Sequence, residues 1–175
     1  DRIITTDEFF ELDDLPASIA VVGLGVIGLE IGQSLKRLGV DVAGIDLLET
    51  IGGITDPKVA HAAIEAIGKE FPLWLGHAAE ISEAEDGKLR VTAGSQSVVV
   101  DKVFASLGRC PNLDNLNLDA LDVTRNQKGI PDHNPNPLQV GDLPVFICGD
   151  VSGNRPILHE AADEGRIAGY NASRD

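Results

Sequence analysis

The feature that most constrains the fold is the glycine-rich stretch VVGLGVIGLE, which lies near the start of the chain. Its glycines follow the spacing G-x-G-x-x-G and are Gly23, Gly25 and Gly28. The apolar run 18–22 is typical of a strand buried on both faces, and apolar residues recur at helical spacing through 27–38. The β-branched stretch 40–46 predicts a second strand. The expected order is a strand, a glycine turn, a helix and a second strand within about 30 residues. This order predicts a βαβ unit with parallel strands.

The glycine turn also has the chemistry of a nucleotide-binding site. In such a site the first glycine permits a sharp turn, the second lets a pyrophosphate approach bare backbone, and the third lets the helix pack closely on the sheet. The N–H groups at the helix start would face the phosphates, and we include Val26 and Ile27 in the same site. A purely structural glycine turn is the alternative interpretation.

An acidic residue follows the second expected strand. Asp46 stands 18 residues after Gly28, where a carboxylate accepts hydrogen bonds from the adenine-ribose hydroxyls of NAD. The same charge would repel the 2′-phosphate of NADP, and the following stretch LLETIGGITDP has no Arg to bind one. These residues favour NAD over NADP, with a simple turn residue as the alternative.

The rest of the chain gives weaker signals. Residues 1–16 are interpreted as a lead-in or linker. Asp56 as N-cap and Pro57 at the first helical position predict a second helix. Short strand-like runs separated by Asp86-Gly87 and Gly94-Ser95 predict a β-meander.

A change in composition predicts a domain boundary near Arg109, because 109–143 is rich in Pro, Asn and Asp. A final strand, PVFICGD, and a helix that begins near Pro156 are expected after it.

Composition excludes several classes of function. The net charge of −14 argues against nucleic acid as a partner. No apolar run reaches the roughly 18 residues that a membrane helix needs and no secretory leader is present, so we expect a cytoplasmic protein without membrane contact. Cys110 and Cys148 are expected to be buried apolar side chains, and the four His form no metal or catalytic constellation. Since the chain has no Met, we expect a piece of a longer protein.

Three later segments fit one known family in order and spacing: ASLGRCPN, PVFICGD and LHEAADEGRIAGYNA. Together with the glycine turn they make the chain resemble the pyridine nucleotide-disulfide oxidoreductases, from the lead-in almost to Asn171. In that family an NAD domain interrupts an FAD domain. The resemblance implies that 17–109 form the NAD-binding domain and 110–175 an incomplete return segment of the FAD domain. The expected fold class is α/β: a Rossmann-like domain with a parallel sheet plus a β-meander, followed by a partial FAD-domain segment.

The resemblance also implies cofactor roles. The three glycines would hold the NAD pyrophosphate, Asp46 the ribose, and Gly108 of SLGR would lie beside the nicotinamide half. Glu30 would lie near the flavin, where the family pairs it with a Lys from the redox-active segment. Asp150 of CGD would accept a hydrogen bond from the flavin ribityl chain. The residues expected to approach the flavin ring begin the last helix and are Ile157, Leu158 and His159.

The chain departs from the family pattern in several segments. It lacks the first glycine motif for FAD, the C-x-x-x-x-C disulfide and the His-Pro-Thr segment with the catalytic His. We therefore expect the chain alone to be inactive, without a catalytic residue beyond Glu30 as a flavin-proximal helper. The expected parent is a homodimer that supplies the remaining FAD and dimerisation domains and passes electrons from a dithiol through its disulfide and FAD to NAD⁺. The alternatives are a flavin reductase with another acceptor, such as mercuric ion or oxygen, a non-catalytic module that senses NAD(H), and a folded scaffold that associates through exposed apolar surface.

Overall fold

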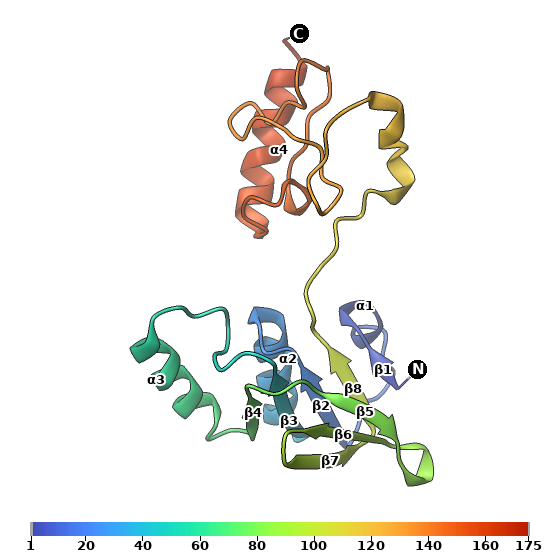
Figure 1. Ribbon diagram of the computed structural model, residues 1–175, viewed down its shortest axis with the longest axis vertical. Coiled ribbons are helices and arrows are strands. Elements are labelled where there is room, and N and C mark those ends of the chain that lie inside the picture. Colours follow the sequence, from blue (N-terminus) through green and yellow to red (C-terminus); the bar gives the residue numbers. More distant parts are fainter. Residues whose placement is uncertain (1, 175) are drawn as a thin grey trace. The chain divides into compact units, whose positions relative to one another are not determined.

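The computed structural model describes residues 2–174, which divide into two compact units. Unit 1 ends at Gly108 and unit 2 begins at Arg109 (Figure 1). The predicted α/β class is confirmed, because unit 1 contains a parallel sheet, a separate antiparallel sheet and helices. The assignment of NAD and FAD domains to these parts of the chain stays a prediction.

The parallel sheet of unit 1 has the strand order β1-β8-β2-β3-β4. Its strands are β1 (Ile3–Ile4), β2 (Ser18–Val22), β3 (Asp41–Asp46), β4 (Leu73–Leu75) and β8 (Lys102–Ala105). Its helices are α1 (Thr6–Phe9), α2 (Val26–Arg37) and α3 (Pro57–Ile67). The predicted βαβ unit is confirmed: α2 connects β2 to β3, which pair in parallel from Ser18 with Asp41 to Val22 with Ile45. The predicted cap of α3 is also present, since Asp56 Oδ1 accepts hydrogen bonds from the N–H groups of Lys58 and Val59.

The predicted β-meander forms the antiparallel sheet of unit 1. Its strands are β5 (Glu80–Glu83), β6 (Leu89–Ala93) and β7 (Gln96–Val100). The two predicted turns connect them, the first as a short 3₁₀ turn, Glu85–Gly87. The chain then returns at Asp101 to the parallel sheet.

Both faces of the parallel sheet are buried, which explains the uninterrupted apolar run of β2. Ile19 and Val21 face one core, which includes Leu35 and Phe104. Ala20 belongs to a second core, in which residues of the antiparallel sheet complete the packing: Leu89, Val91, Ala93 and Val100.

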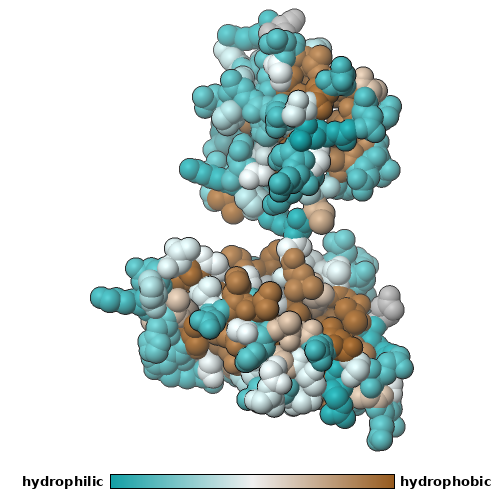
Figure 2. All heavy atoms as spheres, viewed as in Figure 1, coloured by the Kyte–Doolittle hydropathy of each residue, from teal (hydrophilic) through white to brown (hydrophobic). Residues whose placement is uncertain are grey.

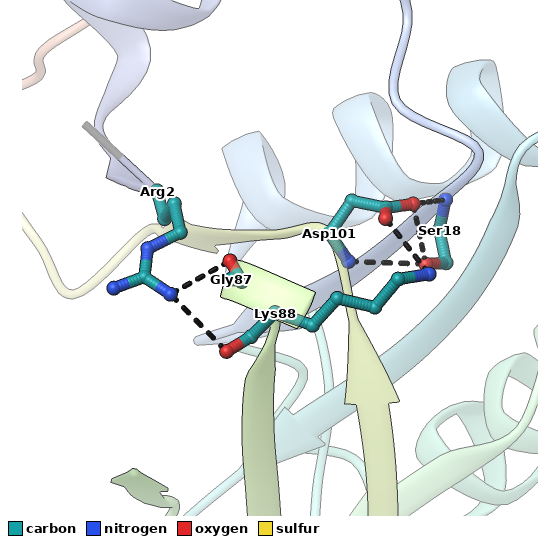
Figure 3. Close-up of polar contacts among 5 residues, drawn as sticks. All are labelled: Arg2, Ser18, Gly87, Lys88 and Asp101. Carbon is teal, nitrogen blue, oxygen red and sulfur yellow. Dashed lines mark hydrogen bonds and ion pairs between the residues drawn. The ribbon is translucent and has the colours of Figure 1, made fainter. Parts of the chain in front are cut away.

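Polar contacts join the two sheets beside the start of β2 (Figure 3). The Asp101 carboxylate accepts hydrogen bonds from the backbone N–H and the hydroxyl of Ser18, both at 2.8 Å, and lies 3.0 Å from Lys88 Nζ. Arg2 donates to the carbonyls of Gly87 and Lys88 at 2.7 and 3.2 Å. These contacts connect β1, β2, β6 and the β7–β8 link.

The lead-in differs from its interpretation as a linker. Ile3 and Ile4 form β1, which pairs with β8, and Ile4 is buried in the core. Phe9 packs edge-on against Phe104 with ring centroids 5.5 Å apart. A two-residue strand is too short to produce a period-2 pattern, so the sequence carried no signal for it.

Unit 2 consists of turns around one long helix, α4 (Leu158–Ala172). Its short 3₁₀ turns are Asp114–Leu116, Leu118–Leu121 and Asp150–Ser152. The predicted strand PVFICGD is wrong: Phe146 forms only an isolated bridge with Gln139. A strand needs a neighbour for its backbone N–H and C=O groups, and the described part of unit 2 provides only single bridges.

The predicted burial of the cysteines is wrong for Cys110, which is exposed, while Cys148 is half-buried. Cys110 lies in the irregular segment at the start of unit 2, outside any helix or strand. Within residues 2–174, no helix has the length and apolar character needed to cross a membrane. The same residues bring together no group of three His, Cys, Asp or Glu side chains suited to a metal ion.

Candidate functional site

The glycine turn lies at the carboxyl end of β2, and two of its glycines are required by close packing. Gly23 has φ +92°, and a Cβ on it would lie 2.3 Å from the carbonyl oxygen of Ser106. A Cβ on Gly28 would lie 1.9 Å from the carbonyl oxygen of Gly23. A side chain at either position would therefore collide with backbone.

Gly25 is different, because it faces open space. A Cβ there would meet nothing within 4 Å, and its φ of −64° is accessible to any residue. It is the N-cap of α2, which has neither a side-chain cap nor an acidic residue in its first turn. Val26, the first helical residue, is 60% exposed, whereas Ile27 is half-buried against the core. The α2 N-terminus therefore presents backbone N–H groups and partial positive charge to an open surface.

The topology brings a second loop to this edge. β3 and β8 flank β2 on opposite sides, so the carboxyl ends of all three parallel strands meet there. Ser106 N–H donates to the carbonyl of Val22 at 2.8 Å, and Gly108 follows with φ +101° and open space where a Cβ would be. The crevice at such a reversal of strand order is where open α/β sheets bind ligands.

Asp46 ends β3 at the same edge and is half-buried. Its Oδ2 accepts a hydrogen bond from Leu24 N–H at 2.6 Å, and its Oδ1 accepts one from Leu48 N–H at 2.8 Å. The hydrogen bond to Leu24 was not predicted; it joins the loop after β2 to the end of β3.

Exposed apolar side chains are a further feature of this region that sequence reasoning missed. Leu47 and Leu48 follow Asp46 and are 68% and 59% exposed, and Leu107 before Gly108 is 75% exposed. Figure 2 shows hydrophobic side chains gathered on the visible face of unit 1. The consecutive leucines after an expected strand end were the available signal.

Glu30 lies one turn into α2 and is exposed. Its carboxylate makes no hydrogen bond or ion pair with any residue from 2 to 174. Its carboxylate is therefore available to a group outside the described chain.

The remaining predicted residues belong to unit 2. Asp150 Oδ2 accepts a hydrogen bond from Arg109 Nη1 at 2.5 Å, and Arg109 Nη2 also donates to the carbonyl of Pro156 at 3.4 Å. Arg109 thus holds the CGD turn close to the start of α4. Glu164 of α4 fixes the same turn by accepting from Gly149 N–H at 2.7 Å.

The start of α4 is open. The N-cap residue, Ile157, makes no side-chain capping bond, and Leu158 is 87% exposed. His159 is exposed beside it. Unit 2 therefore brings Asp150 and these three residues together around an uncapped helix N-terminus.

The fold and the glycine turn define the class: unit 1 is an α/β protein of the Rossmann kind. Residues 1–165 match the family model described as pyridine nucleotide-disulphide oxidoreductase. The chain belongs to this family, as its sequence motifs predicted.

Within the family, the chain is similar to dihydrolipoamide dehydrogenase, the enzyme that several of its relatives are named for. A dihydrolipoyl dehydrogenase from Cupriavidus necator is 34% identical, covering 92% of this chain and 36% of the relative. A mercuric reductase from Staphylococcus aureus is 28% identical, covering 97% of this chain and 32% of the relative. The HOCl-induced flavoprotein disulfide reductase RclA from Escherichia coli has the same fold, with a TM-score of 0.84 at 20% identity over 94% of this chain and 38% of that one. The chain spans about a third of the length of these relatives.

Proposed function

We propose that unit 1 binds NAD(H) and that unit 2 contributes part of an FAD site, in a flavoprotein of the dihydrolipoamide dehydrogenase type. The observation that carries this proposal is the shared edge of the parallel sheet, where the open backbone at Gly25 and the carboxylate of Asp46 meet. The helix N-terminus suits a pyrophosphate, and the carboxylate suits a ribose diol.

The charges around Asp46 favour NAD over NADP. The carboxylate is held by two backbone N–H groups and forms no ion pair with a described residue. Glu49 lies nearby, with its Cγ 3.4 Å from the Cβ position of Gly76 in the loop that follows β4. A 2′-phosphate would meet the negative charges of Asp46 and Glu49, neither of which forms an ion pair with a described residue.

Apolar groups support the two ring systems of the same ligand. Leu47 and Leu48 are exposed beside the ribose acceptor, where an adenine would cover them. Leu107 is exposed next to the open backbone of Gly108, and Val26 is exposed at the start of α2; a nicotinamide ring would lie against this surface. Covering such surface stabilises a complex through the hydrophobic effect.

The residues of unit 2 fit a flavin. Asp150 can accept a hydrogen bond from a ribityl hydroxyl, while Ile157, Leu158 and His159 would face the ring. The open N-terminus of α4 would stabilise an anionic reduced flavin. Glu30 would lie near the flavin and pair with a Lys outside this chain.

The proposed parent reaction converts dihydrolipoamide and NAD⁺ to lipoamide, NADH and a proton, with bound FAD as the electron carrier. Its redox disulfide and catalytic His are absent from this sequence, so the chain alone would be inactive. The whole protein would be a cytoplasmic homodimer. Mercuric ion is a second candidate acceptor, favoured by the mercuric reductase among the relatives.

Calorimetric titration tests the NAD(H) site. NADH at millimolar concentration should release heat and NADPH should bind at least about tenfold more weakly, a difference of about 1.4 kcal/mol. Gly25→Val should abolish NADH binding while preserving the fold, because its side chain enters open space that the pyrophosphate would need. Gly169→Ala, at another open glycine, is the control and should bind NADH like the unaltered chain. Equal binding of NADH to the Gly25→Val variant would refute the site.

A further inference from the structure

The Asp46 carboxylate accepts hydrogen bonds from backbone groups, which a residue that only binds a ribose would not need. Both of its carboxylate oxygens are already used by backbone N–H groups in the ligand-free fold, from Leu24 at 2.6 Å and Leu48 at 2.8 Å. Hydrogen bonds to an ionised acceptor are stronger than those between neutral groups. The carboxylate therefore connects the loop after β2 to the loop after β3.

The peptide groups around Leu24 are held from two sides. Its N–H donates to Asp46, while its carbonyl accepts from Gly52 N–H at 2.7 Å. Its side chain is fully buried, so packing also restrains the residue. Leu24 directly precedes Gly25, whose open backbone begins α2. Fixing the peptide at Leu24 thus fixes the direction in which the following N–H groups point.

We infer that Asp46 is a positioning residue for the pyrophosphate half of the dinucleotide as well as an acceptor for its ribose. The inference rests on the proposed function. Through Leu24 the carboxylate shapes the glycine turn before any ligand arrives, which lowers the entropy cost of binding. An Asn at this position has a single acceptor oxygen, so it cannot hold both amides in this way.

Inorganic pyrophosphate separates the two roles, because it contains no ribose. If Asp46 acted only through its ribose contact and its charge, Asp46→Asn would bind pyrophosphate equally well or more tightly, since one repulsive charge is removed. If Asp46 positions the glycine turn, the same variant should bind pyrophosphate more weakly. Only the positioning role predicts weaker binding of pyrophosphate.

The experiment uses the whole 175-residue chain. Amide hydrogen exchange followed by NMR should show exchange of the Leu24 and Leu48 amides accelerated about tenfold in Asp46→Asn. Chemical-shift titrations should show severalfold weaker binding of both NADH and pyrophosphate. Asp41→Asn is the matched control: this exposed carboxylate lies at the opposite end of β3 and, among residues 2–174, forms an ion pair with Lys36 alone. It should change neither the exchange rates nor the affinities.

Unchanged exchange at Leu24, or pyrophosphate affinity that is unchanged or higher in Asp46→Asn, would overturn the inference. A loss of NADH affinity with unchanged pyrophosphate affinity would leave Asp46 as a ribose acceptor alone. If the unaltered chain binds neither ligand, the proposed function and the pyrophosphate role fail together. In that case, comparing the hydrogen exchange rate of the Leu24 amide in the unaltered chain and in Asp46→Asn still decides whether Asp46 shapes the turn.

Discussion

At the scale of single residues, packing requires two of the three glycines in the motif and leaves the third free. Gly23 and Gly28 leave no room for a Cβ, whereas Gly25 has open space around it. The motif and its strand–turn–helix context identified all three residues and predicted a separate role for each. They could not give the distances to Ser106 or Gly23 that make two of them structural, because those contacts depend on how the turn packs against β8.

Alanine at two of these positions should separate stability from binding. Gly28→Ala should lower the free energy of unfolding by about 3 kcal/mol or more, because its Cβ would overlap a backbone oxygen that cannot move aside. Gly25→Ala should cost less than about 1 kcal/mol, the effect of a poorer N-cap. Urea unfolding measures both. A Gly28→Ala protein as stable as Gly25→Ala would contradict the packing described for the turn.

At the scale of elements, the helices and strands that have a local sequence pattern were predictable, whereas the pairing of strands was not. Apolar periodicity, glycine spacing and β-branched residues predicted the β2–α2–β3 unit. Each of these patterns can be recognised within one short segment of the sequence. β1 consists of two residues and exists because β8 lies beside it. PVFICGD has the composition of a strand but finds only an isolated bridge in unit 2. Which strands pair depends on the whole fold. Composition could therefore neither predict strand β1 nor exclude a strand at PVFICGD.

The candidate site divides in the same way. The residues on the glycine turn and at the end of β3 were found from spacing, because parallel strands bring their carboxyl ends together. The bond from Leu24 to Asp46 and the ion pair of Arg109 with Asp150 were not found. Each of these contacts joins residues far apart in the sequence, and no periodic pattern connects them.

The contact between sheets at Asp101 makes stability depend on pH. The hydrogen bond from the Ser18 hydroxyl, followed by that from Lys88, lowers the pKa of Asp101 below its usual value. A carboxyl with a lowered pKa stabilises the fold above its unfolded pKa of about 3.9, and this contribution is lost as the pH falls through the lower folded value. Asp101→Ala should therefore cost about 1 to 3 kcal/mol at pH 7.

The difference between the unaltered chain and Asp101→Ala should shrink as the pH falls below 4, because protonation removes the same interaction. Urea unfolding at pH 7 and at pH 3 measures it. Asp13→Ala, which removes an exposed carboxylate of the lead-in, controls for the general loss of a negative charge. A constant difference at both pH values would show that the ionised form of Asp101 contributes nothing.

At the scale of the whole molecule, the two units differ in how much core each one has. Among the described residues, the buried hydrophobic side chains of unit 2 are Ile130, Leu138, Val140, Ile147 and Ala168. Unit 1 has two clusters of buried residues that cover both faces of its parallel sheet. Burial of apolar surface is the main favourable term in folding, so unit 2 should be the less stable of the two.

Unfolding should therefore proceed in two steps. Amides of α4 and the turns around it should exchange through an opening of lower free energy than amides of β2, β3 and β8. In urea, signals from unit 2 should be lost first, while those from Trp74 in unit 1 persist to higher concentration. NADH should shift only the second step upward, because a ligand stabilises the unit that binds it. A single transition reported identically by both sets of signals would contradict this division, and a shift of the first step by NADH would move the proposed NAD(H) site out of unit 1.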